Sequence, residues 1–167
     1  EVVVAEFGER GIEGHTAEVV TEVAAGEVRY SDGSTRAFDE LVAFPPYIAA
    51  LRYEGLPSDD RGFLETDLAT RRVAGHPEIY APGDAGDFPV KQAFLAFLQA
   101  DSAAAHIGSR VLGREPEAAF DPVSMCVMEQ YDKATFAQVP LRLTGDPARP
   151  IEVRPGADGD YVVGSSK

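Results

Sequence analysis

The residues best suited to chemistry gather in segment 78–86, Glu-Ile-Tyr-Ala-Pro-Gly-Asp-Ala-Gly, which precedes a long helical stretch. An apolar strand that ends in glycine allows the backbone to approach a ligand closely. Asp84 places a carboxylate at the carboxyl end of that strand, where open α/β sheets bind their ligands. The start of the next helix adds free N–H groups and the positive end of a helix dipole. The alternative is a plain strand, turn and helix in which Asp84 is only a turn residue.

No other motif for catalysis accompanies this segment. The dinucleotide fingerprint G-x-G-x-x-G, the phosphate-binding loop G-x-x-x-x-G-K-[ST] and the nucleophile motif G-x-S-x-G are all absent. The three histidines are scattered and Cys126 stands alone, so no metal site is expected. A single cysteine cannot form an internal disulfide, which is compatible with a cytoplasmic location.

A long helix is expected to follow the chemical segment. Residues 90–112 contain no proline, and Pro89 and Gly113 bracket them as helix boundaries usually are. Apolar residues recur near i, i+3 and i+4, and Phe94, Phe97 and Leu98 are expected to form the core face of this helix. Residues 114–145 read as strands.

Short strands are expected in the first half of the chain. EVRY (27–30) and STRAF (34–38) flank an Asp-Gly turn and predict a β-hairpin. Residues 39–44 are mostly apolar and predict a buried strand, and residues 63–67 predict another short strand. Residues 1–10 fit a strand by propensity and a helix by spacing, and periodicity leaves both open.

Composition excludes several classes of function. The chain has 167 residues, 44% hydrophobic and 26% charged, which is enough for one ordinary domain or two small ones. Its 15 basic and 28 acidic residues give a formal net charge of −13. That charge argues against nucleic acid and against electrostatic docking on anionic lipid as main partners. No apolar run is long enough to span a bilayer.

The order of these motifs resembles the C-terminal half of FAD-dependent pyridine-nucleotide-disulfide-type oxidoreductases. That superfamily carries a strand of the form (I/V)YA-x-GD-x-A before a helix, as residues 79–85 do here. The stretches 11–13, 28–39 and 62–67 follow the family order upstream. Pro45-Pro46 and the sequence Pro-Val-Lys at 89–91 are most similar to the sulfide:quinone oxidoreductase group.

The resemblance implies an α/β fold, with a partial Rossmann-like dinucleotide-binding domain and a β-rich C-terminal segment. Residues 1–72 would complete a dinucleotide-binding-like domain, and residues 73–113 would return to the FAD domain. Residues 114–167 would begin a C-terminal interface domain. The chain would then be a fragment, with the family's first G-x-G-x-x-G fingerprint lying before Glu1.

The resemblance also implies FAD as cofactor, bound by six residues: Gly83, Asp84, Ala85, Val90, Lys91 and Gln92. The Asp84 carboxylate would hydrogen-bond the ribityl or pyrophosphate region. Lys91 and Gln92 would lie near the pyrimidine edge of the flavin, although Lys91 is equally well explained as a surface lysine. Cys126 lies where the sulfide:quinone group carries a redox cysteine, and its alternative is a packed core thiol.

The expected function of the parent is electron transfer from a small donor, such as sulfide or NADH, through FAD to a quinone-like acceptor. The parent would be an FAD-dependent enzyme, whereas the isolated fragment would be inactive. The parent protein would be cytoplasmic. Two further possibilities stay open for it: peripheral contact with a membrane through parts outside this chain, and homo-oligomerisation. The rival hypothesis is a non-enzymatic α+β oligomerisation or regulatory module without a cofactor.

Overall fold

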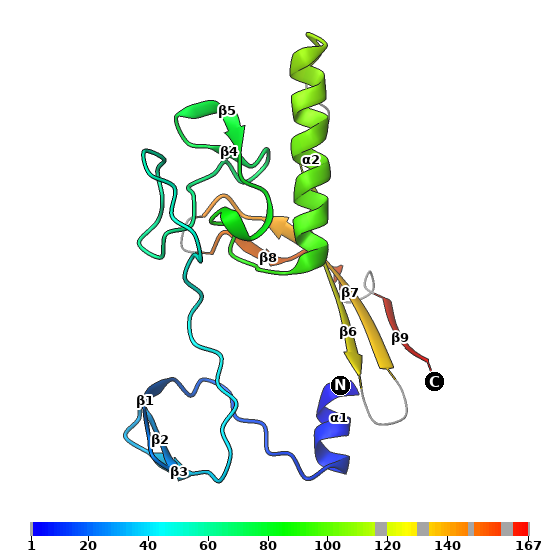
Figure 1. Cartoon of the computed structure of the whole chain (residues 1–167). Coiled ribbons are helices and arrows are strands. Elements are labelled where there is room, and N and C mark those ends of the chain that lie inside the picture. The colour runs from blue at the N-terminus through cyan, green and yellow to red at the C-terminus, as the bar shows by residue number, and fades with distance from the viewer. Residues whose placement is uncertain (1, 116–119, 130–133, 147–148, 158–161, 167) are drawn as a thin grey trace. The chain divides into compact units, whose positions relative to one another are not determined.

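The computed structural model describes residues 2–115, 120–129, 134–146, 149–157 and 162–166. These residues form two compact units, which divide after Pro46 (Figure 1). The domain limits expected at residues 72 and 113 concern a parent protein and stay predictions.

The first unit contains a short helix and a small antiparallel sheet. Helix α1 is Val2–Glu9, and the strands are β1 (Val20–Ala24), β2 (Glu27–Tyr30) and β3 (Thr35–Ala37), in that order across the sheet. The hairpin expected from the Asp-Gly turn is therefore confirmed. Residues 1–10, for which the pattern left two possibilities, are mostly helical.

The buried strand expected at residues 39–44 is wrong. No strand is formed there, and the side chains of Val42 and Phe44 are 83% and 86% exposed. An apolar run becomes a buried strand only if a neighbouring strand pairs with it, and the described residues offer none. The short strand expected at residues 63–67 is likewise reduced to isolated bridges at Leu64 and Thr66.

The first helices and strands of the second unit, which starts at Tyr47, are a hairpin, a short turn and the long helix. Strands β4 (Arg72–Val73) and β5 (His76–Tyr80) pair antiparallel, and the 3-10 turn η1 (Gly83–Ala85) follows. Helix α2 spans Ala93–Val111, which confirms the helix expected at residues 90–112 within a few residues at each end.

The C-terminal part is rich in strands, as expected. Strands β6 (Val123–Glu129) and β7 (Ala134–Leu143) pair antiparallel over seven residues. The other edge of β7 pairs with β8 (Ile151–Val153) and β9 (Val162–Ser166), so β7 is the centre of this sheet.

A Rossmann-like sheet is not found in the described part of the chain. Every pair of named strands is antiparallel, and the parallel pairing consists of one isolated bridge between Leu64 and Gly86. A Rossmann sheet needs a helix that crosses over between parallel strands of one sheet. Helix α2 instead connects β5 to β6, which belong to different sheets.

Two small cores stabilise the second unit. Leu64, Val73 and Ala81 form one below the β4–β5 hairpin. The other contains Phe88, Leu95, Phe120 and Leu141, with the rings of Phe88 and Phe120 edge to face at 5.4 Å.

Arg71 is fully buried between these elements. Its guanidinium lies 5.2 Å from the centre of the Phe88 ring. It donates hydrogen bonds to the Asp67 carbonyl at 3.3 Å and to the Asp87 carboxylate at 3.4 Å. Arg71 also has a φ of +60°, a conformation that costs energy in a residue other than glycine.

The turn from Asp67 to Thr70, which leads into Arg71, makes the free energy of unfolding depend on pH in the acid range. Burial alone raises the pKa of Asp67, but the hydroxyl and N–H of Thr70, both 2.7 Å from the carboxylate, hold that pKa below its ordinary value. A lowered pKa in the folded state gives stability that is present above the unfolded pKa of about 3.9 and lost as pH falls through the folded pKa.

We therefore expect urea unfolding to show a lower free energy of unfolding at acid pH, and Thr70→Val to flatten that pH dependence below about pH 4. Ser102→Ala is the control, because the Ser102 hydroxyl donates to a backbone carbonyl and not to a carboxylate. An unchanged pH slope in Thr70→Val would contradict the role given to this turn.

Candidate functional site

The turn predicted as the chemical centre packs against helix α2. Gly83 has a φ of +69°, and its N–H donates to the Gln99 side-chain oxygen at 2.9 Å in a buried hydrogen bond. A Cβ at Gly83 would lie 3.1 Å from the Cβ of Ala96, so glycine allows this close approach. The Asp84 side chain beside it is exposed.

Lys91 is half-buried at the start of α2. Its ammonium group lies 3.8 Å from the centre of the Phe63 ring and donates to the Gly86 carbonyl. Burial lowers the pKa of Lys91, and the charge of Asp84 opposes that change. The neighbouring residue, Val90, packs against the core of Phe88 and Leu95.

Gln92 connects the start of α2 to the edge of β6. Its amide N–H₂ donates to the Met125 carbonyl at 2.9 Å, and its oxygen accepts from the Met125 N–H at 3.2 Å. The side chain thus makes the two hydrogen bonds that a neighbouring strand would make. The same N–H₂ lies 3.0 Å from the sulfur of Cys126. Cys126 is exposed, so its interpretation as a packed core thiol is wrong.

The structure places the predicted site residues in two separate groups, one at a pocket and one beside β6. Asp84, Ala85 and Lys91 line one pocket of about 390 Å³, whose remaining wall is mostly apolar residues of the segment 47–53. Gln92 and Cys126 lie in contact on the β6 side. The roles of the six residues toward FAD, and a redox role for Cys126, stay predictions.

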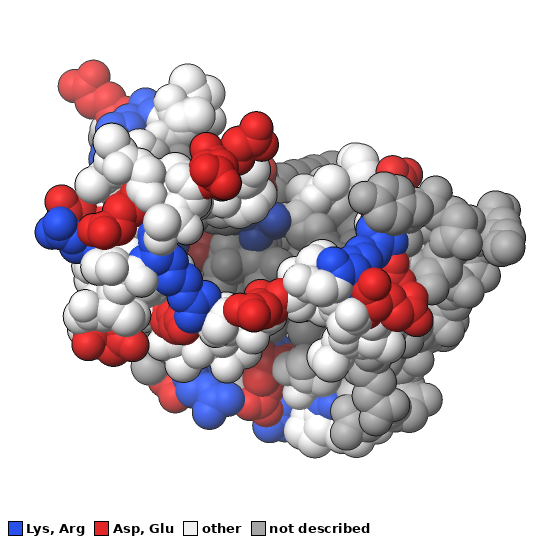
Figure 2. Space-filling view, turned by 90° about the horizontal axis from the view of Figure 1, so that it is seen from below, with Lys and Arg blue, Asp and Glu red and all other residues white. Residues whose placement is uncertain are grey.

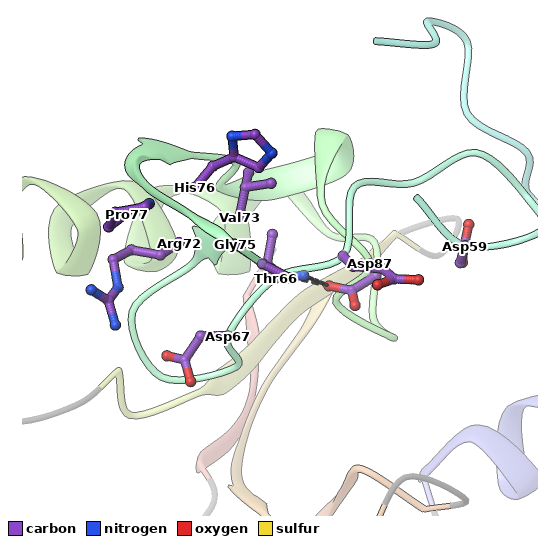
Figure 3. A pocket seen from close by; sticks show the side chains of 11 residues that line it. Asp59, Thr66, Asp67, Arg72, Val73, Gly75, His76, Pro77 and Asp87 are labelled. Atoms are coloured by element: carbon purple, nitrogen blue, oxygen red, sulfur yellow. Dashed lines mark hydrogen bonds between the residues drawn. The ribbon is translucent and has the colours of Figure 1, made fainter. Parts of the chain in front are cut away.

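A larger, open hollow of about 770 Å³ adjoins the β4–β5 hairpin (Figure 3). The hydroxyl of Thr66 donates to the Asp87 carboxylate at 2.6 Å, and Figure 3 shows Asp59 and Asp67 on opposite sides of that pair. In the described part of the chain, no group of three or more potential metal ligands is found.

Polar side chains spaced by three or four residues attach α2 to its own unit: Gln99, Ser102, His106 and Arg110. The ring Nδ1 of His106 and the hydroxyl of Tyr80 are 2.6 Å apart. Arg110 donates to the Pro77 carbonyl. The face of α2 that is turned toward the protein therefore mixes polar and apolar residues, since Leu95 and Ala103 are buried there and Leu98 packs against the core.

Besides the apolar residues that pack inward, a second apolar stripe of α2 points outward. It consists of six exposed residues spaced alternately by four and three, which we term the outer stripe: Ala93, Phe97, Ala100, Ala104, Ile107 and Val111. The side chains of Phe97, Ile107 and Val111 are 68%, 42% and 80% exposed. Figure 1 shows β4 and β5 on one side of α2, while β6, β7 and β9 extend from its N-terminal end on the other side.

An apolar stripe that faces solvent, as the outer stripe of α2 does, is unusual, because the apolar residues of a surface helix normally face the core. Contiguous exposed apolar residues mark interaction surfaces more often than chance. The expectation that Phe97 belongs to the core face is therefore wrong. A signal was present in the sequence, since Gln99, Ser102 and His106 already form a second, polar line at helical spacing.

The outer stripe itself is apolar, although Asp101 is exposed next to it. On the face shown in Figure 2, acidic and basic side chains alternate, and neither sign gathers in one large patch. None of the outer stripe residues is charged. No helix in the described residues is both long enough and apolar enough to cross a membrane.

Fold and site together define an α+β chain in which one apolar face of α2 is exposed among the residues that the structure describes. No family model and no curated protein matches the sequence. A solved structure with a similar fold is the cryo-EM structure of the Tetrahymena thermophila mitochondrial ATP synthase, an F1Fo composite tetramer model. One of its chains superposes with a TM-score of 0.56 at 21% identity, over 81% of this chain. This chain spans 35% of the length of that chain.

This comparison corrects the expected family. The structural neighbour is a chain of an ATP synthase and not an FAD-dependent oxidoreductase, so the resemblance to the sulfide:quinone oxidoreductase group is overturned. The expected flavoprotein enzyme and its electron transfer from a small donor to a quinone-like acceptor are overturned with it. The physical reason lies in the motifs, because a strand, a glycine turn and a following helix occur in many folds.

Proposed function

We propose that this chain is a non-enzymatic α+β module that joins a larger protein assembly through the outer stripe of α2. The observation that carries the proposal is the division of α2 into two faces. Polar side chains hold the helix to its own unit together with Leu95 and Leu98, and a second line of apolar residues is left on the surface. A helix arranged in this way lowers its free energy when a protein partner covers the stripe.

Burial of the outer stripe contributes a substantial favourable free energy to association. Moving a side chain such as Phe97, Ile107 or Val111 from full exposure to burial is worth about 1.5–3 kcal/mol. The three residues are partly exposed already, so their combined contribution is smaller than the full sum. Part of that contribution offsets the loss of translational and rotational freedom on association.

The structural neighbour supports a place in an assembly. Its chain is part of an ATP synthase complex, and the similar region makes up 35% of that chain. A module of this size that contributes contacts and no chemistry fits such a setting. Proteins of one fold nevertheless serve different functions, so the outer stripe is the main support.

Site-specific photo-crosslinking tests the proposal. Benzoylphenylalanine replaces Ile107 on the outer stripe or, as a control, Val153 on β8, which is 51% exposed. We expect irradiation in the producing cells to give a discrete product of higher mass from position 107 and none from position 153. Adding Phe97→Glu to the position 107 variant should abolish the product.

Equal crosslinking from both positions, or no product from position 107, would overturn the proposal. Circular dichroism of each variant shows whether its fold is intact, and the substituted residues are exposed, so little change is expected.

A further inference from the structure

Resting on the proposed function, we infer that the partner of the outer stripe is α2 of a second copy of this chain. The two helices would pack antiparallel about a twofold axis near residue 102. Identical subunits most often associate through such an axis, in which one surface patch is complementary to itself.

The spacing of the stripe is that of a coiled-coil seam. Intervals of four and three residues repeat from position 93 to position 111, which is the heptad pattern of facing helices. Helix α2 has 19 residues and is therefore about 28 Å long, enough for six layers of contacts.

Antiparallel pairing about residue 102 matches every layer of one copy to a layer of the other. Phe97 meets Ile107 of the second copy, and Ala93 meets Val111. Ala100 meets Ala104 at the centre, where two small side chains let the backbones approach closely. Antiparallel pairing thus places the large Phe97 against Ile107 of the second copy. Parallel pairing would instead place Phe97 against Phe97.

Charge near the axis limits the strength of this pair. Helix α2 carries one acidic residue, Asp101, which is exposed next to the outer stripe. In the antiparallel arrangement, Asp101 of each copy lies near the axis on the same face of the helix pair, and the two carboxylates repel each other. Association should therefore strengthen as salt screens this repulsion and the net charge of −13.

Sedimentation equilibrium of the purified chain over a wide range of concentrations tests the inference. We expect a reversible monomer–dimer equilibrium that Phe97→Glu abolishes. Asp101→Asn should tighten it by about two- to fivefold, as expected for removal of one like-charge contact. Val153→Glu adds the same charge on β8 and should leave the equilibrium unchanged.

Disulfide formation tests the orientation. Both chains carry Cys126→Ser, and one carries Ala100→Cys while the other carries Ala104→Cys. We expect an equimolar mixture to oxidise to a covalent dimer faster than either chain alone. Faster oxidation of each chain alone would indicate parallel pairing and overturn the antiparallel arrangement.

The outcomes separate the second copy from the proposed function. A chain that stays monomeric at all concentrations but crosslinks from position 107 to a different protein would overturn the second copy as partner and leave the proposed function standing. A monomeric chain without any crosslinked product would overturn both.

Discussion

Replacing Arg71 by alanine should lower the free energy of unfolding by up to about 3–5 kcal/mol, the cost of breaking a fully buried charged pair. The Asp87 side chain that stays behind is 27% exposed, so the loss lies toward the lower end of that range. The guanidinium is fully buried, and burial lowers the pKa of Arg71. It stacks on Phe88 and donates to the Asp67 carbonyl and the Asp87 carboxylate. Removing it leaves a cavity beside Phe88 and takes one partner from Asp87.

Urea unfolding at neutral pH measures this effect. Arg149→Ala is the matched control, because its side chain is 76% exposed and lies 4.0 Å from Glu152 at the surface. That substitution should change stability by less than about 1 kcal/mol. If the two variants lost a similar amount of unfolding free energy, Arg71 would not be an anchor of the second unit.

Gly86→Ala should destabilise the chain by about 1–3 kcal/mol or more, the range for overpacking of a tight site. A Cβ there would lie 2.5 Å from the Ala81 carbonyl oxygen and 2.9 Å from a guanidinium nitrogen of Arg71. The first of these atoms is backbone, so relief requires the segment directly after β5 to move. That movement would also disturb the bridge between Leu64 and Gly86.

Gly108→Ala provides a control of opposite sign. Gly108 lies within α2, and a Cβ there would meet nothing within 4 Å. Alanine favours a helix over glycine, so this variant should gain about 0.5–1 kcal/mol. Thermal unfolding of the two variants should therefore shift in opposite directions, and a loss of stability in both would contradict the space assigned around Gly108.

Local signals in the sequence predicted the local elements well. The Asp-Gly turn identified the β2–β3 hairpin, because Ser34 donates to Asp32 within the turn itself. The absence of proline from residues 90–112 identified α2. The apolar run 39–44 gave a wrong result, because burial depends on a partner strand that no local pattern reveals.

The candidate site could be predicted only in part. Helical spacing identified Phe97 as part of an apolar face but not the direction in which that face points. The direction is set by Gln99, Ser102 and His106, whose partners are distant in sequence. The motif around Gly83 and Asp84 predicted a strand and a turn correctly, whereas the family attached to it was wrong.

The partners of α2 have a consequence for how this fold changes over time. Gln92, Gln99, Ser102 and Arg110 all contact main-chain atoms of the surrounding segments. Main-chain atoms stay in place when a side chain is substituted, so the residues that supply them can vary while the helix keeps its position. Such a fold can persist in chains whose sequences have diverged beyond recognition.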